Sequence, residues 1–155
     1  MMLSDLLTKE RVSLLEQTSS KKRALELIAE MLSGAAPEVS AEQIFDALND
    51  RERLGSTGLG HGVAIPHGRL EGVHSAVGAV LRLDQGIDYD APDGMPVNLM
   101  FGLVVPQEST DEHLAILSRL AELFADDACV ERLRGAGSAD DFVTVIRNEK
   151  PSFAA

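Results

Sequence analysis

His67 is the residue of this 155-residue chain whose neighbours most favour chemistry. Pro66 holds the backbone before it extended, and Gly68 after it leaves space beside the imidazole ring. Arg69 adds a planar cation of the kind that binds clusters of anionic oxygens. These residue types predict a small, open, positively charged pocket that contains an exposed, nucleophilic imidazole nitrogen.

The segment around His67, residues 51–70, is rich in glycine, which accepts positive φ and close backbone approach. It therefore predicts a shaped loop. Within it, residues 62–65 predict a short strand that must stop at Pro66, which leaves His67 just beyond the strand. Arg51 ends the preceding helix and is expected to reach the same histidine.

His113 is the second candidate, in the first turn of a helix that Ser109 and the residues after it are expected to cap. It shares one helical stripe with Leu117, Leu120 and Phe124, so its ring should turn inward toward the sheet. Because each of the two histidines follows a predicted strand, both are expected at one edge of the sheet, where α/β folds bind ligands.

Four roles are open to these two histidines, and in the first two roles the histidines catalyse no reaction. Both rings could be structural, although the glycines around His67 give more clearance than a structural histidine needs. A zinc site would need three or four ligands, and the chain has no HxH, HxxxH or HExxH pattern. We therefore expect no metal and no cofactor. His61 is expected to face solvent.

The other two roles are catalytic. General acid–base hydrolysis needs a nucleophile, but the only nearby hydroxyls, Ser56 and Thr57, lie outside any GxSxG elbow. Alternatively, His67 could itself accept a phosphoryl group, a transfer that asks mainly for positioning and for cations around the oxygens. The chain lacks a GxxxxGK[ST] nucleotide loop, so the donor would be another protein.

The elements that must position these residues predict a layered α/β domain. Residues 1–17 are read as an arm that packs on the domain, and residues 150–155 as a frayed end. Helices are expected at residues 21–32, 128–134 and 138–147, and another is expected from residue 110 onward. A further helix should begin at a capping box formed by Ser40 and Gln43 and end near residue 54. Strands are expected at 76–83, at 87–89 and at 97–105, the last an apolar run buried on both faces.

Composition limits the possible classes of protein. The length predicts a single domain over residues 1–155. The net charge of −11 argues against nucleic acid as a partner. No apolar run is long enough to span a membrane and no signal peptide is recognised, so we expect a cytoplasmic protein without membrane insertion. Cys129, the only cysteine, excludes an internal disulfide and is expected to be buried.

Two runs of sequence, ERLGSTGLGHGVAIPHGR and VPQESTDEHL, resemble the enzyme IIA proteins of the phosphoenolpyruvate-dependent phosphotransferase system, fructose and mannitol class. The nitrogen-regulatory branch is the nearest match, and the similarity covers about residues 3–146. The resemblance implies a mixed sheet with helices on both faces.

The resemblance also implies roles for individual residues. His67 would be phosphorylated on Nε2, and His113 and Arg51 would stabilise the phosphoryl group. Gly68, Ser56 and Thr57 are possible supports, as is Arg69, which stands where relatives often carry Lys or an uncharged residue.

The implied activity is of the phosphotransferase type, with a phosphohistidine intermediate and a mainly regulatory purpose. An HPr-like phosphocarrier would supply the phosphoryl group, and targets such as potassium-transport or sensor-kinase components would respond to it. Two alternatives stay open: a sugar-transport IIA that passes phosphate to a IIB domain, and a binding module that is never phosphorylated. The sequence does not indicate the oligomeric state.

Overall fold

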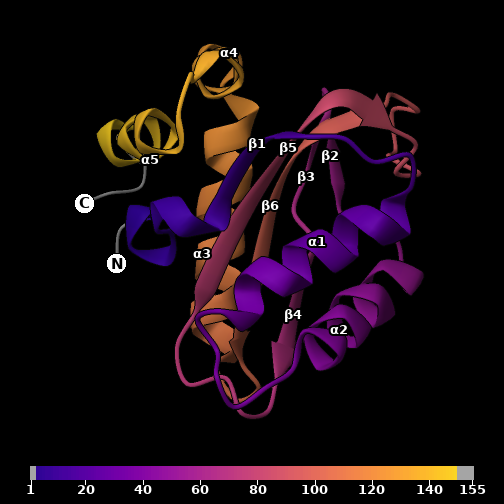
Figure 1. Cartoon of the computed structure of the whole chain (residues 1–155), viewed down its shortest axis with the longest axis vertical. Coiled ribbons are helices and arrows are strands. Elements are labelled where there is room, and N and C mark those ends of the chain that lie inside the picture. The colour runs from indigo at the N-terminus through magenta and orange to yellow at the C-terminus, as the bar shows by residue number, and fades with distance from the viewer. Residues whose placement is uncertain (1–2, 150–155) are drawn as a thin grey trace.

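The apolar run at residues 97–105 forms β6 (Val97–Pro106), the central strand of a mixed sheet in the computed structural model, which describes residues 3–149 (Figure 1). On one side β5 (Val77–Ile87) pairs antiparallel with β6, and β1 (Val12–Glu16) pairs parallel with β5. On the other side β3 (Val63–Ala64) and β4 (His67–Leu70) both run parallel to β6. The edge strand β2 (Gly58–Gly60) pairs antiparallel with β3.

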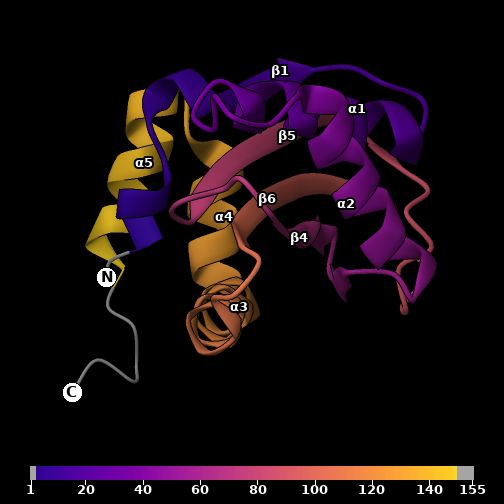
Figure 2. The ribbon, with the colours of Figure 1, turned by 90° about the horizontal axis from the view of Figure 1, so that it is seen from below.

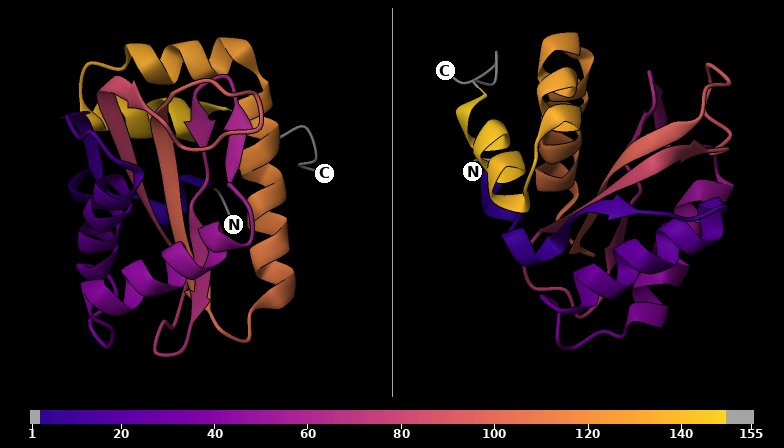
Figure 3. Two further views of the ribbon diagram at one scale, coloured as in Figure 1. Left: turned by 90° about the vertical axis from the view of Figure 1, so that its right-hand side faces the viewer. Right: turned by 45° about the horizontal axis from the view of Figure 1, so that its top comes forward.

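Helices cover both faces of this sheet, which confirms the expected fold class (Figure 3). On one face lie α1 (Lys21–Ser33) and α2 (Ala41–Arg53). On the other lie α3 (Thr110–Ala125), α4 (Asp127–Gly135) and α5 (Ala139–Asn148). The side chains of β6 alternate between the two apolar cores: Leu99, Phe101, Leu103 and Val105 pack toward α3, α4 and α5, and Met100 and Val104 toward α1 and α2.

Short polar side chains cap α1 and α2 as predicted, but Ser109, the residue before α3, makes no side-chain capping hydrogen bond, so the expected cap there was wrong. Ser20 caps α1 through the Arg23 N–H. Ser40 and Gln43 form the predicted capping box of α2, with both reciprocal hydrogen bonds present. The expected helices at 128–134 and 138–147 are present as α4 and α5.

Gly68 in β4 sets how closely α2 can approach the sheet. A Cβ added at this position would lie 3.3 Å from both the Cβ and the carbonyl oxygen of Ala47 in α2. Since such a contact is tighter than ordinary packing, any larger residue here would push α2 outward by a few tenths of an ångström. The close approach brings the end of α2, which carries Arg51, beside His67.

The glycine-rich segment is more regular than predicted. It contains β2, β3 and β4 and is not one shaped loop. Pro66 lacks an N–H and interrupts the hydrogen bonding, but its carbonyl oxygen accepts the Leu103 N–H at 3.0 Å, so the chain continues along β6. His67 follows the end of β3, as expected, but it is also the first residue of a further strand, β4, which the sequence did not predict.

Two further boundaries differ from the prediction. The expected strand at 87–89 is not separate: β5 continues through a register shift between Arg82 and Ile87, and Tyr89 lies outside it. The N-terminal arm packs on the domain as predicted, but it also forms the 3₁₀ turns η1 (Leu3–Leu6) and η2 (Lys9–Arg11) and the edge strand β1.

Figure 2 shows η1 beside α5 on the side of the sheet covered by the C-terminal helices. The predicted frayed end, residues 150–155, lies outside the described residues. Among residues 3–149, no helix is both long and apolar enough to cross a membrane.

Candidate functional site

A pocket of about 780 Å³ brings His67 together with the other residues that the sequence singled out. Its wall comes from the second half of α2 and the residue after it, the start of β4, the first turns of α3, and one residue of the loop that precedes α3. The lining residues are Ala47, Asp50, Arg51, Leu54, His67, Gly68, Arg69, Gln107, Thr110, His113, Leu114 and Leu117. The pocket thus contains two histidines and two arginines, an arrangement that suits an anion.

The imidazole of His67 presents one defined nitrogen to this pocket. Its Nδ1 lies 2.7 Å from the carbonyl oxygen of Ile65. Because a carbonyl oxygen can only accept, Nδ1 carries the proton and Nε2 of the neutral ring keeps a free lone pair. Burial lowers the pKa of His67 below its ordinary value of 6.5, and the charge of Arg51 acts in the same direction. The ring is therefore neutral and nucleophilic near pH 7.

The expectation of an exposed imidazole was wrong, because only 9% of His67 is exposed. β4 pairs with β6, where His67 lies opposite Leu103. Because His67 lines the pocket together with residues of α2 and α3, a reacting group can approach the ring between these two helices.

His113 turns inward from the first turn of α3, as predicted, and is 8% exposed. Its ring lies 5.2 Å from that of His67, centroid to centroid, in an edge-to-face arrangement at 68°. Its Nε2 is buried and has no hydrogen-bond partner among the described residues. Because a buried polar atom without a partner is costly, this nitrogen marks a place where a ligand oxygen would bind.

Burial and neighbouring groups keep His113 uncharged. Burial lowers its pKa to about 4, and His67, which would repel a second imidazolium, and the charges of Arg69 and Arg51 add to the effect. The imidazole can therefore act as a neutral hydrogen-bond donor beside an anion.

Arg51 and Arg69 flank the two histidines from opposite elements. Arg51 donates from Nη1 to the carbonyl oxygen of Gly55 at 2.9 Å. Arg69 donates from Nη1 to Oγ1 of Thr110 at 3.1 Å, which links β4 to the N-terminus of α3. Each guanidinium carries five N–H groups, so both retain donors for an anion in the pocket.

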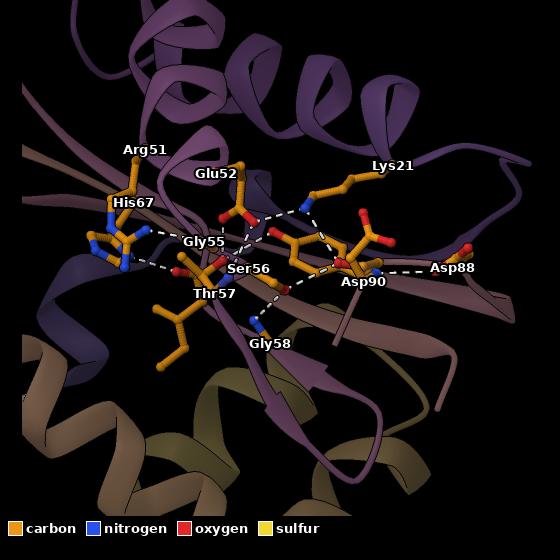
Figure 4. Close-up of polar contacts among 12 residues, drawn as sticks. Lys21, Arg51, Glu52, Gly55, Ser56, Thr57, Gly58, His67, Asp88 and Asp90 are labelled. Carbon is orange, nitrogen blue, oxygen red and sulfur yellow. Dashed lines mark hydrogen bonds and ion pairs between the residues drawn. The ribbon is translucent and has the colours of Figure 1, made fainter. Parts of the chain in front are cut away.

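Ser56 and Thr57 do not line the pocket and belong to a buried polar cluster behind it (Figure 4). Ser56 donates to the Tyr89 carbonyl oxygen at 3.1 Å. Thr57 donates from its backbone N–H and its hydroxyl to Glu52, whose carboxylate also binds Lys21. Both hydroxyls therefore have structural partners, and the partner of Thr57, Glu52, was not found by sequence reasoning.

Glu52 was missed although the spacing of α2 contained a signal for it. The buried residues of α2 are Ile44, Leu48 and Glu52, which follow one another at intervals of four. A carboxylate that continues an apolar i, i+4, i+8 stripe must be buried, and a buried carboxylate needs partners.

The remaining histidines lie outside the pocket. His61 is exposed, as predicted, and its backbone N–H donates to Asp93 at 2.9 Å. His74 pairs with Glu38 on the surface at 2.8 Å. Within residues 3–149, no group of three or more His, Cys, Asp or Glu side chains is arranged to hold a metal ion.

Comparison with known proteins supports the same interpretation of the chain. The family model described as "Phosphoenolpyruvate-dependent sugar phosphotransferase system, EIIA 2" matches residues 5–149. A nitrogen regulatory protein of Pseudomonas aeruginosa is 44% identical over 144 residues, which cover 93% of this chain and 94% of that protein. A nitrogen regulatory protein of Escherichia coli K12 is 42% identical over 147 residues, 93% of this chain and 88% of its own length.

A solved structure agrees with these sequence matches. The crystal structure of the nitrogen regulatory protein IIA-Ntr from Neisseria meningitidis superposes with a TM-score of 0.89 at 41% identity. The superposition covers 93% of this chain and 98% of that one. The resemblance noted in the sequence is confirmed, including its nearest branch.

Proposed function

The chain belongs to the EIIA 2 family of the phosphoenolpyruvate-dependent sugar phosphotransferase system and has the phosphoryl-accepting, regulatory character of its nitrogen-type relatives, and we propose that His67 accepts the phosphoryl group. The observation that carries this assignment is the hydrogen bond from His67 Nδ1 to the Ile65 carbonyl oxygen. It leaves Nε2 as the only ring nitrogen with a lone pair, directed at a pocket with two arginines.

The transfer follows from this geometry. Nε2 attacks the phosphorus of a phosphorylated HPr-like carrier, a bond forms between Nε2 and phosphorus, and the bond from phosphorus to the donor breaks. Arg51 and Arg69 stabilise the phosphoryl oxygens, and His113 donates a hydrogen bond in the tautomer that has its proton on Nε2.

Phosphorylation would act on partners through local charge. A phosphoryl group adds roughly two negative charges at neutral pH, at a rim where Leu54 and Leu114 are 84% and 62% exposed. An apolar or acidic partner surface would dock less well against this form. Members of the family interact with phosphocarrier and IIB partners. For this chain we propose cytoplasmic targets such as potassium-transport or sensor-kinase components.

Labelling tests the proposal directly. Incubation with phosphoenolpyruvate, enzyme I and an HPr-like carrier is expected to add one acid-labile phosphoryl group, detected by intact mass. His67→Ala is expected to abolish the label, whereas His61→Ala, a change of an exposed histidine outside the pocket, is expected to keep it. Full labelling of His67→Ala would overturn the assignment.

A further inference from the structure

Glu52 is a buried carboxylate that the proposed chemistry does not use. It is 8% exposed, and it reaches from the last turn of α2 toward Lys21, whereas the neighbouring Arg51 reaches toward His67 (Figure 4). Lys21 Nζ lies 2.9 Å from its Oε1, and the Thr57 N–H donates to the same oxygen at 3.1 Å. The Thr57 hydroxyl donates to Oε2. Both carboxylate oxygens are therefore engaged, and both the backbone and the side chain of Thr57 are held.

Tyr89 completes this cluster. Its hydroxyl lies 3.1 Å from Oγ1 of Thr57. Since the single hydroxyl proton of Thr57 goes to Glu52, Tyr89 must be the donor in this contact. The ammonium group of Lys21 lies 4.3 Å from the centroid of the Tyr89 ring. Thr57 is thus fixed by groups from α2 and from the segment after β5, so its backbone has little freedom to shift.

From Thr57 the hydrogen bonds continue to His67. The Ile65 N–H donates to the Thr57 carbonyl oxygen at 3.0 Å, and the Ile65 carbonyl oxygen accepts from His67 Nδ1 at 2.7 Å. The next residue, Pro66, has no N–H, and its carbonyl oxygen accepts the Leu103 N–H at 3.0 Å. The Ile65 carbonyl group thus lies between two anchored points, and the bond to Thr57 is the one that helps to set its position from the N-terminal side.

We propose that Glu52 is a positioning residue, which acts through Thr57 and Ile65 to keep the His67 proton on Nδ1 and leave Nε2 free. In a neutral imidazole the hydrogen bond made by one nitrogen decides which nitrogen carries the proton. A displaced Ile65 carbonyl would let the proton move to Nε2 and remove the nucleophilic lone pair. Only the kinetic consequence of this inference rests on the proposed function.

The ring ¹⁵N chemical shifts of His67 in the unphosphorylated protein test the inference at neutral pH. Wild type is expected to show protonated Nδ1 and bare Nε2. Glu52→Gln exchanges an acceptor oxygen for an NH₂ donor and should give a mixture of the two tautomers. Asp46→Asn removes one charge from an exposed position on the same helix and should leave the shifts unchanged.

A second pair of variants keeps the test decisive if Glu52→Gln does not fold. Thr57→Val removes the hydroxyl that donates to Glu52 but retains the side-chain shape, and Thr57→Ser restores the hydroxyl. The tautomer mixture is expected in Thr57→Val and the wild-type pattern in Thr57→Ser. The inference would be overturned if the His67 ring ¹⁵N chemical shifts of Thr57→Val, and of Glu52→Gln where that variant folds, were the same as those of wild type.

Phosphorylation rates give a separate consequence. Transfer to folded Glu52→Gln is expected to be about tenfold slower than to wild type, since the nucleophilic form is depleted and misplaced. If wild type itself is not labelled on His67, the proposed function fails, while the tautomer measurement still decides the role of Glu52. A normal rate combined with mixed tautomers would overturn the kinetic part.

Discussion

The last turn of α2 carries two neighbouring ionic side chains with opposite surroundings. Glu52 faces the interior, where Lys21 and Thr57 occupy both of its oxygens. Arg51 faces the pocket, beside a His113 nitrogen that has no partner among the described residues. Both oxygens of Glu52 thus have partners within the protein, whereas the pocket holds a polar atom that has none among the described residues. This difference indicates that changes on the Glu52 side cost stability first, and changes on the pocket side cost phosphoryl transfer first.

The largest expected effect on stability is that of Glu52→Ala. Removing the carboxylate leaves the Thr57 N–H and Lys21 without their buried acceptor, which should lower the free energy of unfolding by about 3 kcal/mol. Urea unfolding measures the loss, with Asp46→Ala as the exposed control on the same helix, expected to change by less than about 0.5 kcal/mol. Equal losses in the two variants would remove the distinction between the two sides of α2.

On the pocket side, His113→Ala should slow phosphoryl transfer to His67 by about 10- to 100-fold, since one donor to the phosphoryl oxygens is lost. The domain should stay folded and lose less stability than in Glu52→Ala. Rapid-quench labelling and thermal unfolding together measure both effects. A transfer rate equal to that of wild type would make His113 a core residue only.

The low pKa of His113 also makes stability depend on pH. Its value of about 4 in the folded protein lies below the ordinary 6.5 of an unfolded chain. Between these pH values the unfolded chain binds a proton that the folded protein does not, so stability is lost as pH falls from 6.5 toward 4. The loss from this one group is on the order of 2 kcal/mol.

Urea unfolding of wild type and His113→Gln at pH 7, 5.5 and 4 isolates that contribution, because the carboxylates titrate in both proteins. Wild type is expected to lose more stability than the variant over this range. Parallel curves would contradict the pKa assignment.

The smallest expected effect is that of Arg69→Gln. Because Arg69 is exposed, solvent and salt screen its charge, so its loss should slow transfer only about threefold at low salt, with the difference shrinking as salt rises. Arg53→Gln, at the exposed end of α2 and outside the pocket, is the control. A slowing that does not change with salt would indicate a direct structural role for Arg69.

Sequence patterns predicted the long elements well because their signals are strong. Residues 97–105 form one apolar run and α2 begins with a capping box, so periodicity and local chemistry agree there. Residues 58–70 were harder, since strands of two to four residues carry too few side chains for any period to show. Their pairing is decided by β6, which lies far away in sequence.

The candidate site was predicted only in part, because local sequence patterns carry little information about contacts between distant residues. Residue type and local spacing pointed to His67, His113 and Arg51, and the fold brings all three to one pocket. Local spacing could not reveal that Thr57 binds Glu52 and faces away from the pocket. It also could not show that the His67 side chain is buried, because this burial arises only in the folded protein.

The central place of β6 in the sheet also bears on aggregation. Its apolar run VNLMFGLVV combines strong strand preference with no charge, which is the composition of segments that assemble into cross-β fibres. In the native sheet both of its edges are taken, by β5 on one side and by β3 and β4 on the other. The strands left at the sheet edges are short: the five-residue β1, the three-residue β2 and the four-residue β4, which pairs with β6 on one side. Aggregation should therefore begin from chains in which β6 is not yet paired, and refolding at high protein concentration is the condition under which this protein is most vulnerable.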